Sequence, residues 1–204
     1  MSVKVEFLFD FGSPNAYFCH KVIPAIEART GARFEYQPIL LGGLFKLANN
    51  RSPMEAYAAI PNKLAYDRLE IGRFVRRHGL TAFRMNPHFP VNTLKVMRGA
   101  CAAQPLGCLM PYVDAVYAAM WEQQLDMADD ATIATVLQRA ALDAQALLAA
   151  SQQAEVKDRL LQNTQQAHAR GAFGSPTFFV NGEIFFGKDR LRDVEEEIVR
   201  VAAG

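Results

Sequence analysis

The sequence predicts an α/β fold in which the two ends of the chain form one sheet and a long helical segment is inserted between them. Three observations predict it. Residues 3–11 alternate apolar and polar side chains with a period of two, as a strand that enters a core does. Residues 172–187 hold two more strand-length apolar runs, joined by the hairpin signal Asn181-Gly182. Between about residues 44 and 150 strand signals are missing, and apolar stripes of helical length are separated by prolines.

The first strand is followed by a turn that begins a helix. Ser13 is a favoured N-cap residue and Pro14 suits the first helical position. The helix is expected to run to about Thr30, with Pro24 kinking or splitting it. A helix N-terminus offers unpaired N–H groups and a partial positive charge, which would stabilise an anion beside Ser13. The alternative, in which Ser13 only caps the helix, stays open at this point.

A second strand is predicted over residues 33–41, where an alternating run becomes apolar. The two strands and their helix would form a βαβ unit with parallel strands and a right-handed crossover. Gly42-Gly43 is expected to end this half of the chain. Helices of the inserted segment are predicted over residues 67–78, 93–103, 112–124, 132–141 and 143–150.

Apolar positions at helical spacing predict which side chains of the insertion are buried. In residues 67–78 these are Leu69, Phe74 and Val75, and the arginines opposite them are interpreted as a solvated face rather than a binding patch. Trp121 is expected in the core or lining a pocket. The same is expected of Met97, Met110, Met120 and Met127.

The last part of the chain returns to mixed structure. A long helix is predicted from about Glu155 to Gly171, with Leu160 and Leu161 among its apolar positions. Strands over residues 177–180 and 183–186 form the hairpin, and Asp189 is expected to open the final helix.

Composition excludes several classes of function. The chain has 204 residues, and its 22 Lys and Arg against 21 Asp and Glu give no global charge to attract nucleic acid or membranes. No stretch has the length of a membrane span, and the N-terminus lacks the pattern of a secretory signal, so a cytoplasmic location is expected. The three cysteines form no C-x-x-C and have no histidine pair at zinc spacing, which indicates buried free thiols and no metal site.

Seven motifs, spread in order over nearly the whole chain, carry a family resemblance. They are Phe9-Asp-Phe-Gly-Ser-Pro-Asn-Ala-Tyr17, Leu41-Gly-Gly, Asn50 with Pro53, Pro61-Asn-Lys63 with Tyr66, Phe89-Pro-Val-Asn-Thr93, Gly171-Ala-Phe-Gly-Ser-Pro-Thr177 and Phe186-Gly-Lys-Asp-Arg-Leu191. With this element order the chain resembles the 2-hydroxychromene-2-carboxylate isomerases, relatives of the kappa-class glutathione transferases and of DsbA-like thiol oxidoreductases. The chain departs from the commoner family pattern at Gly12 and Asn15, which leaves the size of the substrate open.

The resemblance implies a thioredoxin-like fold interrupted by a large all-helical insertion domain. Residues 1–43 and 153–204 would form the thioredoxin-like domain, and residues 44–152 the helical domain. In the thioredoxin plan the turn after the first strand carries C-x-x-C, whose thiolate is stabilised by the helix N-terminus. Those positions here are Ser13-Pro-Asn-Ala16, so disulfide exchange at this site is excluded.

The family uses glutathione as its cofactor, and the resemblance assigns residues to it. Ser13, the catalytic residue, would donate a hydrogen bond to the glutathione sulfur. Pro176 would be a cis-proline, and Ser175 before it would pair with the cysteinyl part of the tripeptide. A plain trans proline at a strand start is the alternative.

Four charged or polar residues match family positions that bind glutathione or lie at the pocket. They are Asn50, Lys63, Lys188 and Asp189. Asp189 would cap the final helix and receive the glutamyl amine, and Lys63, or else Arg84, would hold a carboxylate. For each residue taken alone, a solvated surface side chain is the other interpretation.

The resemblance therefore implies a glutathione-dependent isomerase of a small aromatic carboxylate, functioning as a homodimer in naphthalene-type catabolism. It would interconvert 2-hydroxychromene-2-carboxylate and trans-o-hydroxybenzylidenepyruvate through transient addition of the thiolate, with the aromatic ring in an apolar slot of the helical domain. Two alternatives stay open. One is a kappa-like glutathione transferase or peroxidase, and the other is a thioredoxin relative that binds thiols without catalysis.

Overall fold

The computed structural model describes residues 3–204, which form four strands, ten α-helices and one 3₁₀ turn. The elements are β1 (Val5–Phe9), α1 (Pro14–Thr30), β2 (Phe34–Pro38), α2 (Leu41–Leu47), α3 (Pro53–Ala56), α4 (Pro61–His78), α5 (Leu94–Ala103), α6 (Leu109–Trp121), α7 (Asp130–Arg139), α8 (Ala144–Ala150), α9 (Ala154–Ala169), β3 (Thr177–Val180), β4 (Glu183–Phe186), η1 (Lys188–Arg190) and α10 (Leu191–Ala203). None of the helices in these residues is long and apolar enough to cross a membrane.

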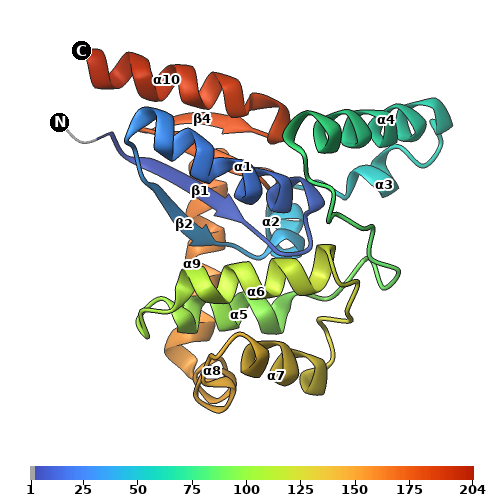
Figure 1. Ribbon diagram of the computed structural model, residues 1–204, viewed down its shortest axis with the longest axis vertical. Coiled ribbons are helices and arrows are strands. Elements are labelled where there is room, and N and C mark those ends of the chain that lie inside the picture. The colour runs from blue at the N-terminus through green and yellow to red at the C-terminus, as the bar shows by residue number, and fades with distance from the viewer. Residues whose placement is uncertain (1–2) are drawn as a thin grey trace.

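The sheet has the strand order β2-β1-β3-β4, so the N-terminal strand lies in its interior. β1 runs parallel to β2 and antiparallel to β3, and β3 and β4 form an antiparallel hairpin. Figure 1 shows the N-terminal strands, in blue, and the C-terminal β4 and α10, in orange and red, gathered in one part of the molecule, with α5 to α8 at its other end. The predicted α/β class, βαβ unit and hairpin are confirmed.

The two faces of the sheet have separate apolar contacts. Phe7 and Phe9 of β1 lie in the larger cluster with side chains of α1, α5, α6 and α10. Leu8, between them, points to the other face, where Leu44 of α2, Ala167 of α9 and Phe179 of β3 form a second cluster. The period-two alternation of the first strand therefore places apolar residues on both faces.

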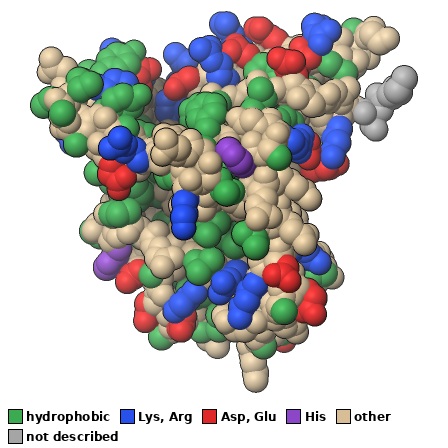
Figure 2. Space-filling model, turned by 180° about the vertical axis from the view of Figure 1, so that it is seen from behind, with side chains coloured by type: hydrophobic (Ala, Val, Ile, Leu, Met, Phe, Trp, Pro, Cys, Tyr) green, Lys and Arg blue, Asp and Glu red, His purple; other side chains and the backbone are tan. Residues whose placement is uncertain are grey.

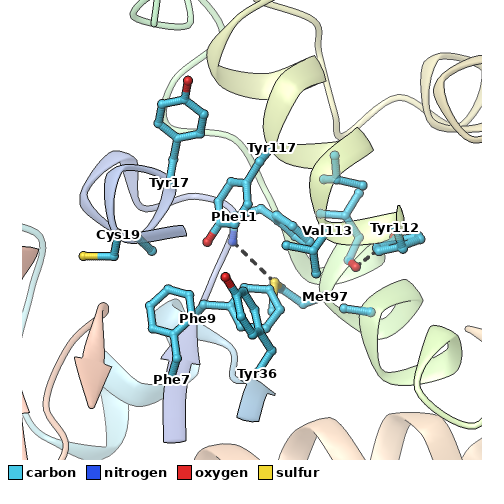
Figure 3. Packing of buried hydrophobic residues seen from close by; sticks show 14 of the residues in the cluster. Phe7, Phe9, Phe11, Tyr17, Cys19, Tyr36, Met97, Tyr112, Val113 and Tyr117 are labelled. Carbon is cyan, nitrogen blue, oxygen red and sulfur yellow. Dashed lines mark hydrogen bonds between the residues drawn. The ribbon is translucent and has the colours of Figure 1, made fainter. Parts of the chain in front are cut away.

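The inserted helices join the sheet through the residue just before the Ser13 turn. The backbone N–H of Phe11 donates to the sulfur of Met97 at 3.4 Å, and the Trp121 indole donates to the Phe11 carbonyl at 2.8 Å. Figure 3 shows Phe11 packed between Tyr117 and Met97. Trp121, Met97, Met120 and Met127 are buried, as predicted. The insertion thus anchors the end of β1.

The strand predicted over residues 33–41 ends early, at Pro38, and Gly42-Gly43 lies inside the helix α2. Two contacts explain why a helix forms across this pair of glycines. The Leu41 N–H at the first helical position donates to Asp10, and Gly43 packs closely on Thr164 of α9, where an added Cβ would lie 3.5 Å from the methyl group. Tertiary contacts override low helix propensity here.

Several expectations within the helices are wrong in detail. Helix α4 begins at Pro61, and Leu69, expected on its inner stripe, is exposed. Met110, expected in the core or lining a pocket, is exposed, and so is Leu161, one of the apolar positions of the helix predicted after Glu155. Helix α1 continues through Pro24 without a break.

The exposure of Leu69 has a cause in the fold. Helices α3 and α4 project from the body of the molecule (Figure 1), so less of their apolar surface is covered. Figure 2, seen from behind, shows apolar side chains gathered at the upper left, over this segment. Met54, Tyr57, Ile60, Tyr66 and Leu69 are exposed there.

Candidate functional site

Ser13 lies between β1 and α1, and its hydroxyl makes two hydrogen bonds. It accepts from the Ala16 N–H at 3.2 Å, as an N-cap does, and it donates to the carbonyl of Ser175 at 2.9 Å. The side chain is 5% exposed. Ser13 therefore caps α1 and at the same time faces the loop before β3, so the two interpretations of this residue are compatible.

The loop before β3 brings Ser175 and Pro176 to the start of α1. The Ser175–Pro176 peptide bond is cis, as predicted. The Pro176 carbonyl accepts from the Gly187 N–H at 2.9 Å, which ties the loop to the residue after β4. The Ser175 carbonyl thus has a fixed place next to the helix N-terminus.

Asn50 is positioned beside the same loop. Its side-chain Nδ2 donates to the carbonyl of Phe173 at 2.9 Å, two residues before Ser175. The Phe173 ring packs on Phe186 with 4.5 Å between ring centroids, and both rings are partly exposed. The pair covers Gly174, where an added Cβ would come within 2.8 Å of the Phe186 ring. An aromatic surface therefore adjoins Ser175.

Lys188 and Asp189 follow directly after Gly187, in the turn η1. The Lys188 ammonium is buried, pairs with the Asp189 carboxylate at 2.5 Å and lies 5.2 Å from the centroid of the Phe74 ring. The Asp189 side chain is 68% exposed. Because Asp189 sits inside η1 and α10 begins at Leu191, the expectation that Asp189 caps the final helix is wrong.

Lys63 is not brought into hydrogen-bonding contact with Ser13 or Ser175 within residues 3–204. Its ammonium pairs with Asp67 one turn along α4 and lies 5.1 Å from the Tyr57 ring centroid. The structure therefore groups Ser13, Ser175 and Pro176 tightly and places Asn50 and the Lys188–Asp189 pair next to their loop. Lys63 belongs to the projecting α3–α4 segment.

Asp10, which the sequence did not single out, lies under the Ser13 turn. Its Oδ1 accepts from the Gly12 N–H at 2.8 Å and its Oδ2 from the Leu41 N–H at 2.7 Å. Burial raises the pKa of Asp10, against the opposing effect of hydrogen bonds from Leu41, Gly12 and the Thr93 hydroxyl. An aspartate at the end of the first strand, directly before the turn, was the available signal.

A second buried polar group, around His20, was also missed by sequence reasoning. One ring nitrogen of His20 lies 2.9 Å from the Tyr36 hydroxyl and the other 2.9 Å from the Asp114 carboxylate, which joins α1, β2 and α6. The hydrogen bond from His20 lowers the pKa of Asp114. Because the three residues are far apart in sequence, no short motif reveals them. Their role here is to join the sheet to the insertion.

The three cysteines are free and lie apart from the positions of a redox dithiol. Cys19 and Cys101 are buried, and Cys108 is partly buried. Burial raises the pKa of Cys19 well above its usual range and that of Cys101 to about 12. No group of three or more metal-binding side chains occurs within residues 3–204.

We expect one fast-reacting thiol in the native protein. Only thiolates react readily with disulfide reagents, and two of the three thiols are buried with raised pKa values. Titration with a chromogenic disulfide should show a single fast phase, absent in Cys108→Ser, with the other two thiols reacting only after unfolding. A fast phase that persists in Cys108→Ser would contradict this assignment.

Comparisons with known proteins agree with this geometry. A family model described as a DSBA-like thioredoxin domain matches residues 4–199. The chain is 25% identical to a 2-hydroxychromene-2-carboxylate isomerase of Sphingobium xenophagum, over 98% of this chain and 100% of that protein. It is 24% identical to human glutathione S-transferase kappa 1, over 92% of this chain and 87% of that protein. A solved structure of 2-hydroxychromene-2-carboxylate isomerase superimposes with a TM-score of 0.84 at 23% identity, covering 97% of this chain and 95% of the other.

Proposed function

The chain belongs to the family of DsbA-like thioredoxin domains, and on that premise we propose that it is a glutathione-dependent isomerase of 2-hydroxychromene-2-carboxylate or a closely related aromatic carboxylate. The observation that carries the proposal is Ser13, at the helix N-terminus where the thioredoxin plan has a cysteine. Such a position stabilises a thiolate but here holds no thiol. A thiol supplied by a ligand fits it.

The hydrogen bond between Ser13 and Ser175 explains how glutathione would be received. A hydroxyl has one proton to donate, and that of Ser13 goes to the Ser175 carbonyl. When glutathione binds, the Ser13 hydroxyl turns to the sulfur, and the freed Ser175 carbonyl accepts the cysteinyl N–H of the tripeptide. One internal hydrogen bond is thus exchanged for two to the ligand.

The site would keep the thiol ionised. A free thiol has a pKa of about 8.5, and both the N-terminus of α1 and a hydrogen bond from Ser13 favour its anion. The polar residues near the loop would hold the rest of the tripeptide. We assign the exposed Asp189 carboxylate to the glutamyl amine, with Lys188 fixing that carboxylate, and Asn50 to the peptide. Lys63 is assigned to a carboxylate of tripeptide or substrate.

The chemistry proposed for the thiolate is a reversible addition. The sulfur adds to the carbon β to the ketone of the ring-opened substrate, and the electron pair moves to the ketone oxygen as an enolate. The former double bond is then single and rotates. When the enolate collapses, the double bond forms again and the thiolate leaves, so glutathione is regenerated. The exposed rings of Phe173 and Phe186 offer apolar surface for the aromatic part of the substrate.

The homodimer and the cytoplasmic location are proposed with this function. The reducing cytoplasm keeps glutathione as a thiol, which the mechanism requires. Both can be checked by sedimentation and by fractionation of cells that produce the protein.

Product analysis tests the proposed reaction. Incubation with 2-hydroxychromene-2-carboxylate and glutathione should yield trans-o-hydroxybenzylidenepyruvate, with all glutathione recovered unchanged. A stable conjugate, or glutathione consumed with a peroxide, would instead indicate the kappa-like transferase or peroxidase, a possibility favoured by the human relative. Glutathione binding without any turnover would indicate a non-catalytic thiol-binding protein.

A further inference from the structure

Asp10 connects two segments that the proposed site needs in a fixed relation. Its two carboxylate oxygens accept from different parts of the chain, one from Gly12 in the Ser13 turn and one from Leu41 at the first position of α2. The carboxylate is 1% exposed. Both hydrogen bonds are short, at 2.8 and 2.7 Å, and two backbone N–H groups that would otherwise be unpaired are satisfied by one side chain.

The second segment leads directly to Asn50. Helix α2 runs from Leu41 to Leu47, and the Asn50 N–H donates to the Phe45 carbonyl at 2.8 Å just after it. The Asn50 side chain then donates to Phe173, in the loop that carries Ser175. The chain of contacts runs from Asp10 through α2 to that loop, and from Asp10 through Gly12 to Ser13.

The residues around Asp10 fit closely against its carboxylate. An added Cβ at Gly12 would lie 3.3 Å from Asp10 Oδ1 and 3.2 Å from the Thr93 methyl carbon, so a glycine suits the turn that wraps the carboxylate. Thr93, at the start of α5, donates its hydroxyl. Tyr117 of α6 is a titratable neighbour of Asp10. Burial and Tyr36 raise the pKa of Tyr117, and the charge of Asp10 raises it further. No cation pairs with this carboxylate within residues 3–204.

We propose that Asp10 is a positioning residue that holds the Ser13 turn and helix α2 together, so that Ser13 and Asn50 act on the same bound glutathione molecule. This inference rests on the proposed function. It assigns Asp10 no contact with the ligand, because the residue is 1% exposed. An asparagine would keep one acceptor oxygen and turn an NH₂ group toward the other N–H, so one of the two hydrogen bonds must be lost.

One variant breaks the link to α2 at the backbone. Leu41→Pro deletes the N–H from which Asp10 accepts, and the proline ring takes the place of that hydrogen, so Oδ2 must move away and the link is lost. Proline is favoured at the first helical position, and Leu40 before it is already extended at φ −97° and ψ 107°. Leu41→Ala is the matched variant, because it loses the leucine side chain but keeps the N–H.

Two measurements read the result. The first is hydrogen exchange without ligand. The Gly12 and Leu44 amides should exchange faster in Asp10→Asn than in wild type. The Leu44 amide should also exchange faster in Leu41→Pro than in Leu41→Ala. Calorimetry with glutathione should show affinity about tenfold lower for Leu41→Pro than for Leu41→Ala, because binding must then restore the position of α2 relative to the Ser13 turn, at a cost of up to the energy of the lost hydrogen bond. Leu41→Pro should raise KM for glutathione more than it lowers kcat, whereas Asp10→Asn should change both.

The outcomes separate this inference from the proposed function. Asp143→Asn, which alters an N-cap carboxylate of α8 at the far end of the insertion, controls for loss of an acidic group. If wild type binds glutathione and Leu41→Pro binds it as Leu41→Ala does, the positioning role of Asp10 is wrong and the proposed function stands. If wild type does not bind glutathione, the proposed function fails and the positioning role fails with it. Hydrogen exchange then still reports whether Asp10 holds the Ser13 turn and α2 together.

Discussion

Replacement of Ser13 by alanine should lower glutathione-dependent turnover by roughly tenfold to a hundredfold, the effect of losing one hydrogen bond to an anion. The Ser13 hydroxyl is the side-chain donor proposed for the glutathione sulfur, and its partner carbonyl on Ser175 is left free in the variant. Glutathione can therefore still pair through its backbone. We expect kcat to fall more than KM rises when initial rates are measured at varied glutathione.

Ser13 also caps α1, so the experiment needs a variant that loses a cap and nothing else. Ser52→Ala provides it, because Ser52 accepts from the Glu55 N–H and precedes Pro53 as Ser13 precedes Pro14. Ser52→Ala should lower the free energy of unfolding by about 1 kcal/mol, and Ser13→Ala should lower it by more, because it also leaves the buried Ser175 carbonyl without its donor. Equal turnover in Ser13→Ala and Ser52→Ala would show that Ser13 is only a cap.

Gly99→Ala should destabilise the helical insertion more than any other glycine-to-alanine change within residues 3–204. A Cβ at Gly99 would lie 2.0 Å from the Tyr112 hydroxyl oxygen and 2.7 Å from the ring carbon that bears it. Tyr112 cannot withdraw easily, because it is buried and its hydroxyl donates to the Val96 carbonyl at 2.9 Å. Figure 3 shows this ring beside Met97 and Val113. Overpacking of this kind costs about 3 kcal/mol, measurable by chemical denaturation.

A second substitution shows whether the ring causes the loss. Tyr112→Phe removes the closest atom, so Gly99→Ala should cost less in that background, and a double-mutant cycle gives the difference. Gly72→Ala in α4 is the matched control, because an added Cβ there meets only the flexible end of Arg76 at 3.5 Å. That change should be neutral or slightly stabilising. If Gly99→Ala behaves like Gly72→Ala, the close approach of α5 and α6 is wrong.

The strands and the Ser13 turn could be predicted from the sequence because their signals are local. The alternation of residues 3–11, the Ser13-Pro14 pair and the Asn181-Gly182 turn each fix structure within a few residues. The family resemblance added the fold and the cis bond before Pro176. The sequence was therefore enough to predict the Ser13 turn and the loop that carries Ser175 and Pro176.

The rest depended on contacts between distant residues. Nothing local shows that Gly42 and Gly43 belong to a helix, since that helix is fixed by Asp10 and by packing on α9. The same is true of the His20 bridge to Asp114. Exposure of Leu69 followed from the projection of α4, which periodicity does not encode. The domain boundaries and the ligand contacts of all the site residues, Lys63 included, stay predictions.

The proposed function requires that this site stabilise the thiolate of a bound ligand. The most direct test is a pH titration of the glutathione complex, followed by the ultraviolet absorbance of the thiolate, for wild type and Ser13→Ala. We expect the thiol pKa of bound glutathione to lie well below its free value of about 8.5 in wild type and to rise toward that value in the variant. Glutathione that binds with an unchanged thiol pKa, or that does not bind, would contradict it.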